Sequence, residues 1–194
     1  MIRNIFELGR TGDRKFLTTH SLNQLTVGIV GMGRVGSLVA HMLHGLGTKV
    51  IIYHSRERKL EVEKSTGARF VSMDELLAQS DVISLHASKE AGIGYFGKSE
   101  LMTMKEGSLL VNCGFTGGVD SDSLYEQLSS KRIRAAQDDP EDERFNTLPF
   151  STWFNSNSHT AYNTEQANQV ASDMATTSLL NLLETGTDKF QVGI

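Results

Sequence analysis

The chain has 194 residues, a formal net charge of −4 and 39% hydrophobic residues, which suits one globular domain with a full-sized core. A net acidic chain with no run of basic residues gives no reason to expect a nucleic-acid partner. No apolar stretch is long enough to cross a membrane. The single cysteine, Cys113, excludes an internal disulfide and favours a reducing compartment, so we expect a cytoplasmic protein.

The N-terminal residues 1–24 contain a short predicted helix, Ile2–Leu8, and a polar linker. They are too few to form a second domain. We expect the main domain over residues 25–186 and a C-terminal tail over 187–194.

The most informative stretch follows this linker. The apolar run Val27–Val30 predicts a buried strand, and G-x-G-x-x-G comes next, with Gly31, Gly33 and Gly36, before a helix predicted over 34–46. The first glycine permits a tight turn, the second lets a pyrophosphate approach the backbone, and the third lets the helix pack on the strand. With Arg34 and Val35 between these glycines, the pattern predicts a dinucleotide site at the helix N-terminus. A glycine-rich turn without a ligand is the alternative.

The second strand, predicted over Lys49–Tyr53, ends where NAD-specific sites carry an acidic residue that holds the ribose hydroxyls. Here the chain has His54, followed by Ser55, Arg56 and Arg58. Hydroxyl and guanidinium groups suit a 2′-phosphate, so the sequence favours NADP, with NAD as the alternative. The other interpretation is that these basic residues, with Lys59, are the solvated start of the next helix.

Strand-like and helix-like segments alternate almost to the end of the chain. Further strands are predicted at Arg69–Val71, Val82–His86, Ser108–Asn112, Ile133–Ala136 and Trp153–Asn157. Trp153 and Phe154 are expected to belong to a core strand. Further helices are predicted at Glu57–Thr66, Met73–Gln79 (with Ser72 and Glu75 as a capping box), Lys98–Met104, Ser121–Ser129 and Thr164–Leu183. In the last helix, an inner face is expected at Ala167, Val170, Ala171, Met174, Leu179 and Leu182. The pattern predicts an α/β fold: a Rossmann-type, doubly wound parallel sheet of about seven strands with helices on both faces.

Several stretches together resemble the nucleotide-binding domain of the D-isomer-specific 2-hydroxyacid dehydrogenases. They are Leu25–Gly36, Ser72–His86, Leu101–Asn112, Gly117–Asp120, Ala135–Glu143 and His159–Ala161 followed by Thr164 and Glu165. The resemblance covers about residues 22–185. It implies hydride transfer between a nicotinamide cofactor and a 2-oxoacid or 2-hydroxyacid, and a homodimer formed through this domain, with apolar residues such as Ile5 and Phe6 in the contact.

The resemblance also implies roles for particular residues. His159, paired with Glu143, corresponds to the general acid and base, and Asp138 to the aspartate beside the nicotinamide. His86, Cys113 and Gly114 correspond to positions near the cofactor. A surface-loop histidine is the alternative for His159, and membership of the acidic run 138–143 is the alternative for Glu143.

Three departures from the family pattern bear on activity. Phe115 stands where the family has the arginine that holds the substrate carboxylate, and no Arg or Lys occurs between Lys105 and Lys131. The family's substrate domain has no counterpart in this sequence. The loop Ala87–Phe96 is shorter than usual, lacks proline and carries two glycines, so it should be more mobile.

These features leave two hypotheses for the function. The first is an NADP-dependent oxidoreductase of the D-2-hydroxyacid type with very low activity in this chain alone. The second is a non-catalytic NADP-binding sensor or dimerising subunit. We expect no metal site: His41 and His44 have helical spacing, but no third ligand is evident near them.

Overall fold

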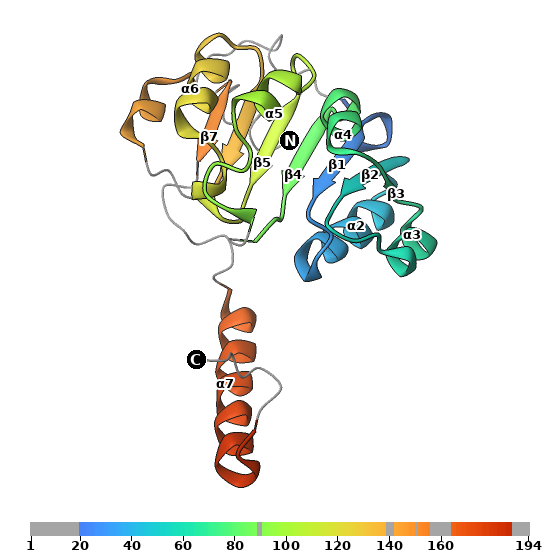
Figure 1. The fold of residues 1–194 in the computed structure, drawn as a ribbon, viewed down its shortest axis with the longest axis vertical. Helices are drawn as coiled ribbons and strands as arrows, with labels where there is room; N and C mark the ends of the chain where they lie inside the picture. The colour runs from blue at the N-terminus through green and yellow to red at the C-terminus, as the bar shows by residue number, and fades with distance from the viewer. Residues whose placement is uncertain (1–19, 89–90, 139–141, 150, 156–163, 188–194) are drawn as a thin grey trace.

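The computed structural model describes residues 20–88, 91–138, 142–149, 151–155 and 164–187. Its centre is a seven-stranded sheet in the order β3-β2-β1-β4-β5-β6-β7, in which every neighbouring pair is parallel (Figure 1). The strands are β1 (Thr26–Val30), β2 (Val50–His54), β3 (Arg69–Phe70), β4 (Val82–Leu85), β5 (Leu109–Asn112), β6 (Arg134–Gln137) and β7 (Trp153–Asn155). The strand order reverses between β1 and β4, which is the point where doubly wound sheets bind their ligands.

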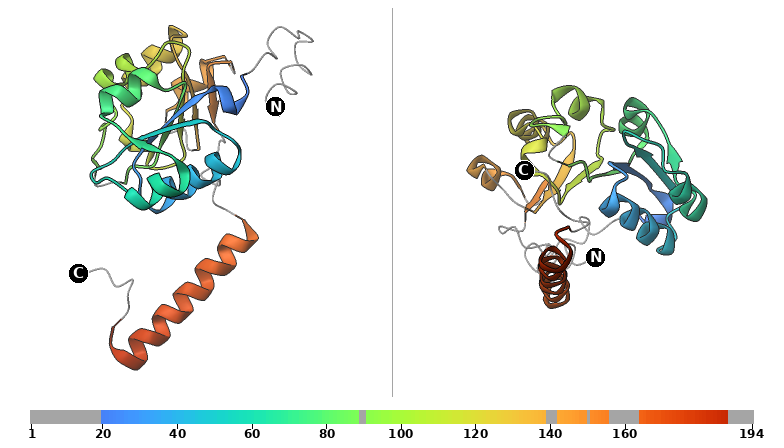
Figure 2. Two further views of the ribbon diagram at one scale, coloured as in Figure 1. Left: turned by 90° about the vertical axis from the view of Figure 1, so that its right-hand side faces the viewer. Right: turned by 60° about the horizontal axis from the view of Figure 1, so that its bottom comes forward.

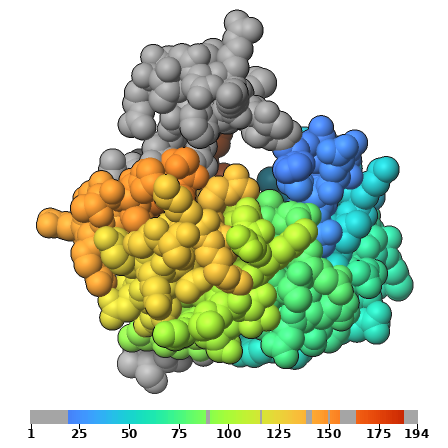
Figure 3. Space-filling view, turned by 90° about the horizontal axis from the view of Figure 1, so that it is seen from above, coloured from blue at the N-terminus to red at the C-terminus, as the bar shows by residue number. Residues whose placement is uncertain are grey.

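Helices cover the sheet from both sides, which confirms the predicted Rossmann-type fold. They are α2 (Arg34–Gly45), α3 (Leu60–Thr66), α4 (Met73–Gln79), α5 (Lys98–Thr103) and α6 (Ser121–Ser129), with short 3-10 turns η2 (Leu22–Gln24), η4 (Thr116–Gly118) and η5 (Glu143–Thr147). On one face, α2 and α3 pack against β1 and β2. On the other face, α4, α5 and α6 cover a larger apolar core. Seen from above, the segments coloured from blue to orange pack side by side into one continuous body (Figure 3).

The strands alternate between these two cores because successive side chains of a strand point to opposite faces. Ile29, Ile51 and Tyr53 belong to the core beneath α2, whereas Ile52 and Ile83 belong to the core beneath α4–α6. Burial on both faces explains why β1 and β2 read as continuous apolar runs.

The predicted elements are present, with ends that differ by a few residues. The largest difference is α3, which begins at Leu60 rather than Glu57. Residues 55–59 form a turn instead, in which the Lys59 backbone N–H donates to the Tyr53 hydroxyl at 2.7 Å. Ser72 caps α4 as predicted, since its hydroxyl accepts from the Glu75 N–H at 3.2 Å. The helix predicted at 2–8, the tail from 188 onward and the end of the seventh predicted strand lie outside the described residues.

Two expectations about packing were wrong. The last helix, α7 (Glu165–Thr185), was expected to bury one face, yet none of its residues is buried. It projects from the body, as two views show (Figures 1 and 2). Trp153 and Phe154 were expected on a core strand, but β7 is at the edge of the sheet; Trp153 is buried, whereas Phe154, on the opposite face of β7, is 43% exposed. No helix of the described residues is long and apolar enough to cross a membrane.

Candidate dinucleotide site

The turn between β1 and α2 lies so close to neighbouring backbone atoms that its first position must be glycine. Gly31 has φ +92°, and a Cβ there would lie 2.7 Å from the backbone carbonyl carbon of His86. The Gly31 N–H donates to the His54 carbonyl at 2.8 Å, and the His86 N–H donates to the Val30 carbonyl at 2.7 Å. The turn is therefore fixed between the ends of β2 and β4, and any side chain at Gly31 would collide with backbone.

The other two glycines of the motif differ from each other in their surroundings. A Cβ at Gly36 would lie 2.0 Å from the Gly31 carbonyl oxygen, so α2 touches the turn directly. A Cβ at Gly33 would meet no atom within 4 Å, and Gly33 lines a pocket instead. This open space at the start of α2 is what a pyrophosphate needs, because the first N–H groups of the helix and its positive dipole end are unobstructed there.

The pocket has a volume of about 720 Å³. Eight of the predicted cofactor residues line it: Gly31, Gly33, Arg34, Val35, His54, Ser55, Arg56 and His86. Residues that the sequence reasoning did not select also line it, among them Met32, Lys59, Met73, Ser88 and Tyr95. Lys59 belongs to the basic run after β2, so the sequence could have identified it as a pocket residue. No local sequence pattern identifies Tyr95 as one.

His54 at the end of β2 is oriented by its neighbours. Its Nδ1 lies 3.1 Å from the Val71 carbonyl, which can only accept, so this nitrogen carries the proton. Its ring stacks on Phe70, with centroids 6.0 Å apart. The next residue, Ser55, donates its hydroxyl to the Glu57 carbonyl, which leaves the oxygen lone pairs of Ser55 to accept.

The basic residues after His54 separate into paired and unpaired groups. Arg58 donates from Nε and Nη2 to the Glu63 carboxylate at 2.8–3.1 Å and is not part of the pocket lining. Lys59 pairs with Glu57 at 3.1 Å. Among the described residues, Arg56 has no ion pair, and it lines the pocket. Arg34 at the start of α2 also lines the pocket and forms no ion pair within the described ranges, so the structure leaves Arg34 and Arg56, but not Arg58, as guanidinium groups available to a ligand.

Glu63 anchors this turn. Its carboxylate accepts from Arg58 and also from the Tyr53 hydroxyl at 2.7 Å. These hydrogen bonds, first from Arg58 and then from Tyr53, lower the pKa of Glu63 to about 2. Because the Tyr53 hydroxyl in turn accepts from the Lys59 N–H, the network fixes the end of β2 to the start of α3.

The β4 end of the pocket is less polar. Burial lowers the pKa of His86, whose Nε2 lies 2.9 Å from the Ser84 hydroxyl, so the imidazole is neutral near pH 7. Burial raises the pKa of Tyr95 to about 12, so its hydroxyl keeps its proton. The Tyr95 ring packs against Gly118, where a Cβ would lie 2.5 Å from the ring.

The predicted residues after β5 and β6 lie outside the pocket lining. The Gly114 N–H donates to the Asn112 side-chain carbonyl at 3.1 Å, and Cys113 is exposed. Burial and the charge of Asp138 raise the pKa of the Cys113 thiol, so it is not an activated nucleophile. Phe115 folds over η4, with its ring 2.8 Å from where a Gly117 Cβ would be.

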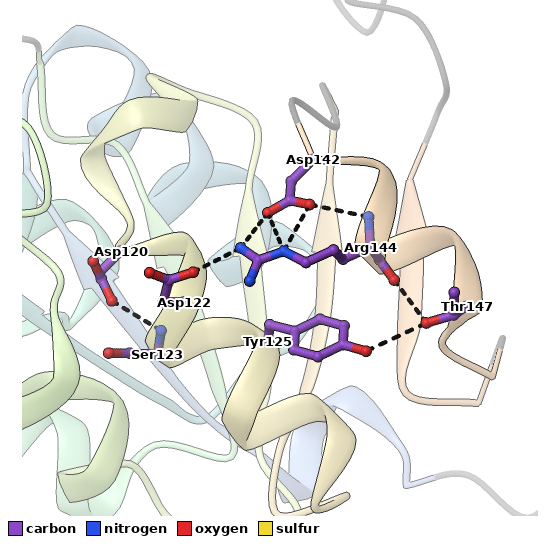
Figure 4. A network of polar contacts seen from close by, with 7 residues as sticks. All are labelled: Asp120, Asp122, Ser123, Tyr125, Asp142, Arg144 and Thr147. Atoms are coloured by element: carbon purple, nitrogen blue, oxygen red, sulfur yellow. Dashed lines mark hydrogen bonds and ion pairs between the residues drawn. The ribbon is translucent and has the colours of Figure 1, made fainter.

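Glu143, the predicted catalytic carboxylate, is exposed at the first position of η5. Its neighbour Arg144 binds Asp142 through two hydrogen bonds from Nε and reaches Asp122 on α6 at 2.7 Å (Figure 4). Arg144 also lies 5.4 Å from the centre of the Tyr125 ring, so η5 is held firmly on α6. His159 lies outside the described residues, and the pairing of Glu143 with His159 stays a prediction. Within the described residues, no group of three or more His, Cys, Asp or Glu side chains could hold a metal.

Comparison with known proteins agrees with this geometry. Residues 3–163 match the family described as D-isomer specific 2-hydroxyacid dehydrogenase, NAD binding domain. A glyoxylate reductase of Aeropyrum pernix is 44% identical over 112 residues, which are 57% of this chain and 33% of that protein. The human glyoxylate reductase/hydroxypyruvate reductase is 37% identical over 122 residues, which are 62% of this chain and 37% of that protein.

Solved structures match over more of the chain. A D-lactate dehydrogenase from Sporolactobacillus superposes with a TM-score of 0.84 at 27% identity and covers 99% of this chain, which is 64% of that structure. The chain spans only about a third of the length of the curated relatives it matches. Since the family match covers most of its residues, the chain belongs to the D-isomer-specific 2-hydroxyacid dehydrogenases, as their NAD-binding domain.

Proposed function

We propose that this chain binds NADP(H) in preference to NAD(H), and that it is the cofactor domain of a D-2-hydroxyacid dehydrogenase with very low activity on its own. The observation that carries the proposal is the pocket at the β1–α2 turn, where the open space at Gly33 meets the unpaired guanidinium of Arg56. The curated relatives named above are reductases of glyoxylate and hydroxypyruvate. A small 2-oxoacid is accordingly the proposed substrate.

The preference for NADP rests on the residues after β2. No carboxylate stands at position 54, where one would bind the ribose hydroxyls and repel a 2′-phosphate. Arg56 can form charge-assisted hydrogen bonds to a phosphate, whereas Lys59 and Arg58 are already paired with carboxylates. Glu57 also lines the pocket, and its carboxylate forms an exposed ion pair with Lys59.

The low activity rests on Phe115. A bound nicotinamide cofactor supplies the hydride, but a phenyl ring cannot pair with a substrate carboxylate or polarise a carbonyl. Losing such a charge-assisted contact in the transition state lowers rates by about 10² to 10⁴. His159 and Glu143 remain the proposed proton donor and its partner.

The same observation supports a second candidate function, a non-catalytic NADP-binding sensor or dimerising subunit. Such a protein would retain a cofactor pocket, which eight predicted residues line here. It would not need a substrate-binding arginine at the position of Phe115. We also propose a homodimer and a cytoplasmic location, the latter from the absence of any cysteine besides Cys113.

Calorimetric titration with NADPH, NADP⁺, NADH and NAD⁺ tests the cofactor proposal. We expect NADPH to bind at least ten times more tightly than NADH, which corresponds to about 1.4 kcal/mol. Arg56→Gln should weaken NADPH and leave NADH unchanged, and Arg58→Gln is the matched control at a paired guanidinium. Equal affinities for the two cofactors would refute the preference.

A further inference from the structure

The pocket at the β1–α2 turn has a charged side and an uncharged side. Within the described ranges, its charged lining residues belong to the start of α2 and to the turn after β2: Arg34, Arg56, Glu57 and Lys59. The lining that follows β4 consists of His86, Ala87, Ser88, Ala91 and Tyr95. None of these five is charged near pH 7, because burial lowers the pKa of His86 and raises that of Tyr95. A ligand that fills the pocket therefore meets charged groups on one side and neutral hydrogen-bonding groups on the other.

Tyr95 is the residue on the uncharged side whose hydrogen-bonding capacity is unused. Its side chain is half-buried, and its hydroxyl makes no hydrogen bond to any residue that the structure describes. His86 differs in this respect, since its Nε2 lies 2.9 Å from the Ser84 hydroxyl. A tyrosine hydroxyl withdrawn from water ordinarily finds a hydrogen-bond partner. A proton donor that lines a pocket and lacks such a partner is suited to bind a ligand there.

The backbone and the ring of Tyr95 are both held against η4. On one side of it in the sequence, the Gly94 N–H donates to the Gly117 carbonyl at 2.9 Å. On the other side, the Phe96 N–H donates to the Gly118 carbonyl, also at 2.9 Å. A Cβ at Gly118 would lie 2.5 Å from the Tyr95 ring, so the ring lies directly on this glycine. Because the side chain is already fixed, little conformational entropy is lost when its hydroxyl binds a ligand.

Two observations assign Tyr95 to the nicotinamide half of a dinucleotide. A doubly wound sheet binds a dinucleotide across the point where its strand order reverses, so that the two halves lie on opposite sides of β1. The 2′-phosphate is proposed to lie beside Arg56 after β2, which leaves the β4 side for the nicotinamide riboside. The Phe115 ring also approaches Gly118, at 3.5 Å from its Cβ position, and the family resemblance implies a substrate-binding group at Phe115. Tyr95 is therefore close to the end of the site where the nicotinamide would meet a substrate.

We propose that the Tyr95 hydroxyl donates a hydrogen bond to an uncharged oxygen of the nicotinamide riboside, either a ribose hydroxyl or the carboxamide oxygen. The hydroxyl would contribute equally to the binding of NADPH and NADH, because the two cofactors share this half. The inference rests on the proposed function, since it requires a dinucleotide in this pocket, but it does not depend on the preference for NADP.

Titration of Tyr95→Phe with NADPH, NADH and 2′,5′-ADP tests the proposal. The substitution removes one oxygen and keeps the ring on Gly118, so the melting temperature should not change. The affinities for NADPH and NADH should fall by the same factor, about five- to tenfold, which is the effect of losing one neutral hydrogen bond. The third ligand, 2′,5′-ADP, carries the adenosine and its 2′-phosphate but no nicotinamide riboside, so its affinity should stay the same.

Tyr125→Phe is the matched control. The Tyr125 hydroxyl lies 3.4 Å from the Thr147 hydroxyl and outside the pocket lining, so its removal should leave all three affinities unchanged.

The outcomes separate failure of this inference from failure of the proposed function. If the unmodified chain binds none of the three ligands, the dinucleotide site is refuted and the inference with it. If Tyr95→Phe binds NADPH as tightly as the unmodified chain does, the role of Tyr95 alone is refuted. A loss of the same size for 2′,5′-ADP would also overturn the inference, because the hydroxyl would then act on the adenosine half or through the shape of the pocket.

Discussion

The turn after β1 and the turn after β5 differ in how strictly their residues are fixed. At the β1–β2 end, Gly31 and Gly36 are required by contacts with backbone atoms, and a network centred on Glu63 holds the following turn. After β5, outside the pocket lining, the ring of Phe115 lies over the glycines of η4, at the position where the family resemblance implies an arginine. We therefore expect cofactor binding to depend on backbone geometry, and any catalysis to depend on side chains that can change while the fold persists.

The largest expected effect concerns the glycines of the β1–α2 turn. Gly36→Ala would place a methyl group 2.0 Å from the Gly31 carbonyl oxygen, so either the turn or α2 must move. We expect a loss of at least about 3 kcal/mol in stability and no measurable dinucleotide binding. Gly45→Ala in the same helix is the control, because nothing lies within 4 Å of its Cβ. It should gain up to about 1 kcal/mol. Thermal unfolding and NADPH titration of both variants would measure this, and near-normal behaviour of Gly36→Ala would contradict it.

The second-largest expected effect concerns the rate of 2-oxoacid reduction. The chain alone should reduce glyoxylate, hydroxypyruvate and pyruvate with NADPH far below the usual enzyme range of about 1 to 10³ per second. The missing arginine acts on the transition state, so cofactor affinity should be unaffected by its absence. Phe115→Arg should therefore leave NADPH affinity unchanged and raise the rate only when a substrate-binding segment is also present. Turnover in the normal range by the unmodified chain would mean that another residue binds the substrate carboxylate.

A smaller effect should follow from a carboxylate at the end of β2. His54→Asp should shift preference toward NADH by about 10- to 100-fold, because the carboxylate binds ribose hydroxyls and repels a 2′-phosphate. Titration with both cofactors measures the ratio of affinities. His54→Asn, similar in size and uncharged, is the control for losing the imidazole contacts with Val71 and Phe70. A similar shift in both variants would attribute the preference to shape rather than charge.

The elements and the turn could be predicted from the sequence because they depend on local patterns. Apolar runs, capping residues and the three glycines each mark a position directly, and the structure places them as expected. The surroundings of α7 and Phe154 could not be predicted, since an apolar stripe is the same whether it packs within the chain or against another molecule. Arg58 pairs with Glu63 because residues 55–59 form a turn before α3. The sequence pattern predicts a helix from Glu57, so this pairing could not be predicted.

The smallest expected effect is the loss of stability on substituting Glu63. This loss should depend on pH. The pKa of Glu63 is lowered to about 2 in the folded protein by Arg58 and Tyr53, whereas an unfolded glutamate titrates near 4.3. The stabilisation is therefore complete above about pH 4.5 and is lost as the pH falls toward 2. Glu63→Gln should lower the melting temperature at pH 7, and the difference from the unmodified chain should shrink steadily below pH 4.5. Glu61→Gln removes an exposed carboxylate that pairs only with Lys64 and should change little at any pH. A difference between Glu63→Gln and the unmodified chain that stays constant down to pH 2.5 would show that the contact stabilises the turn through shape and not through charge.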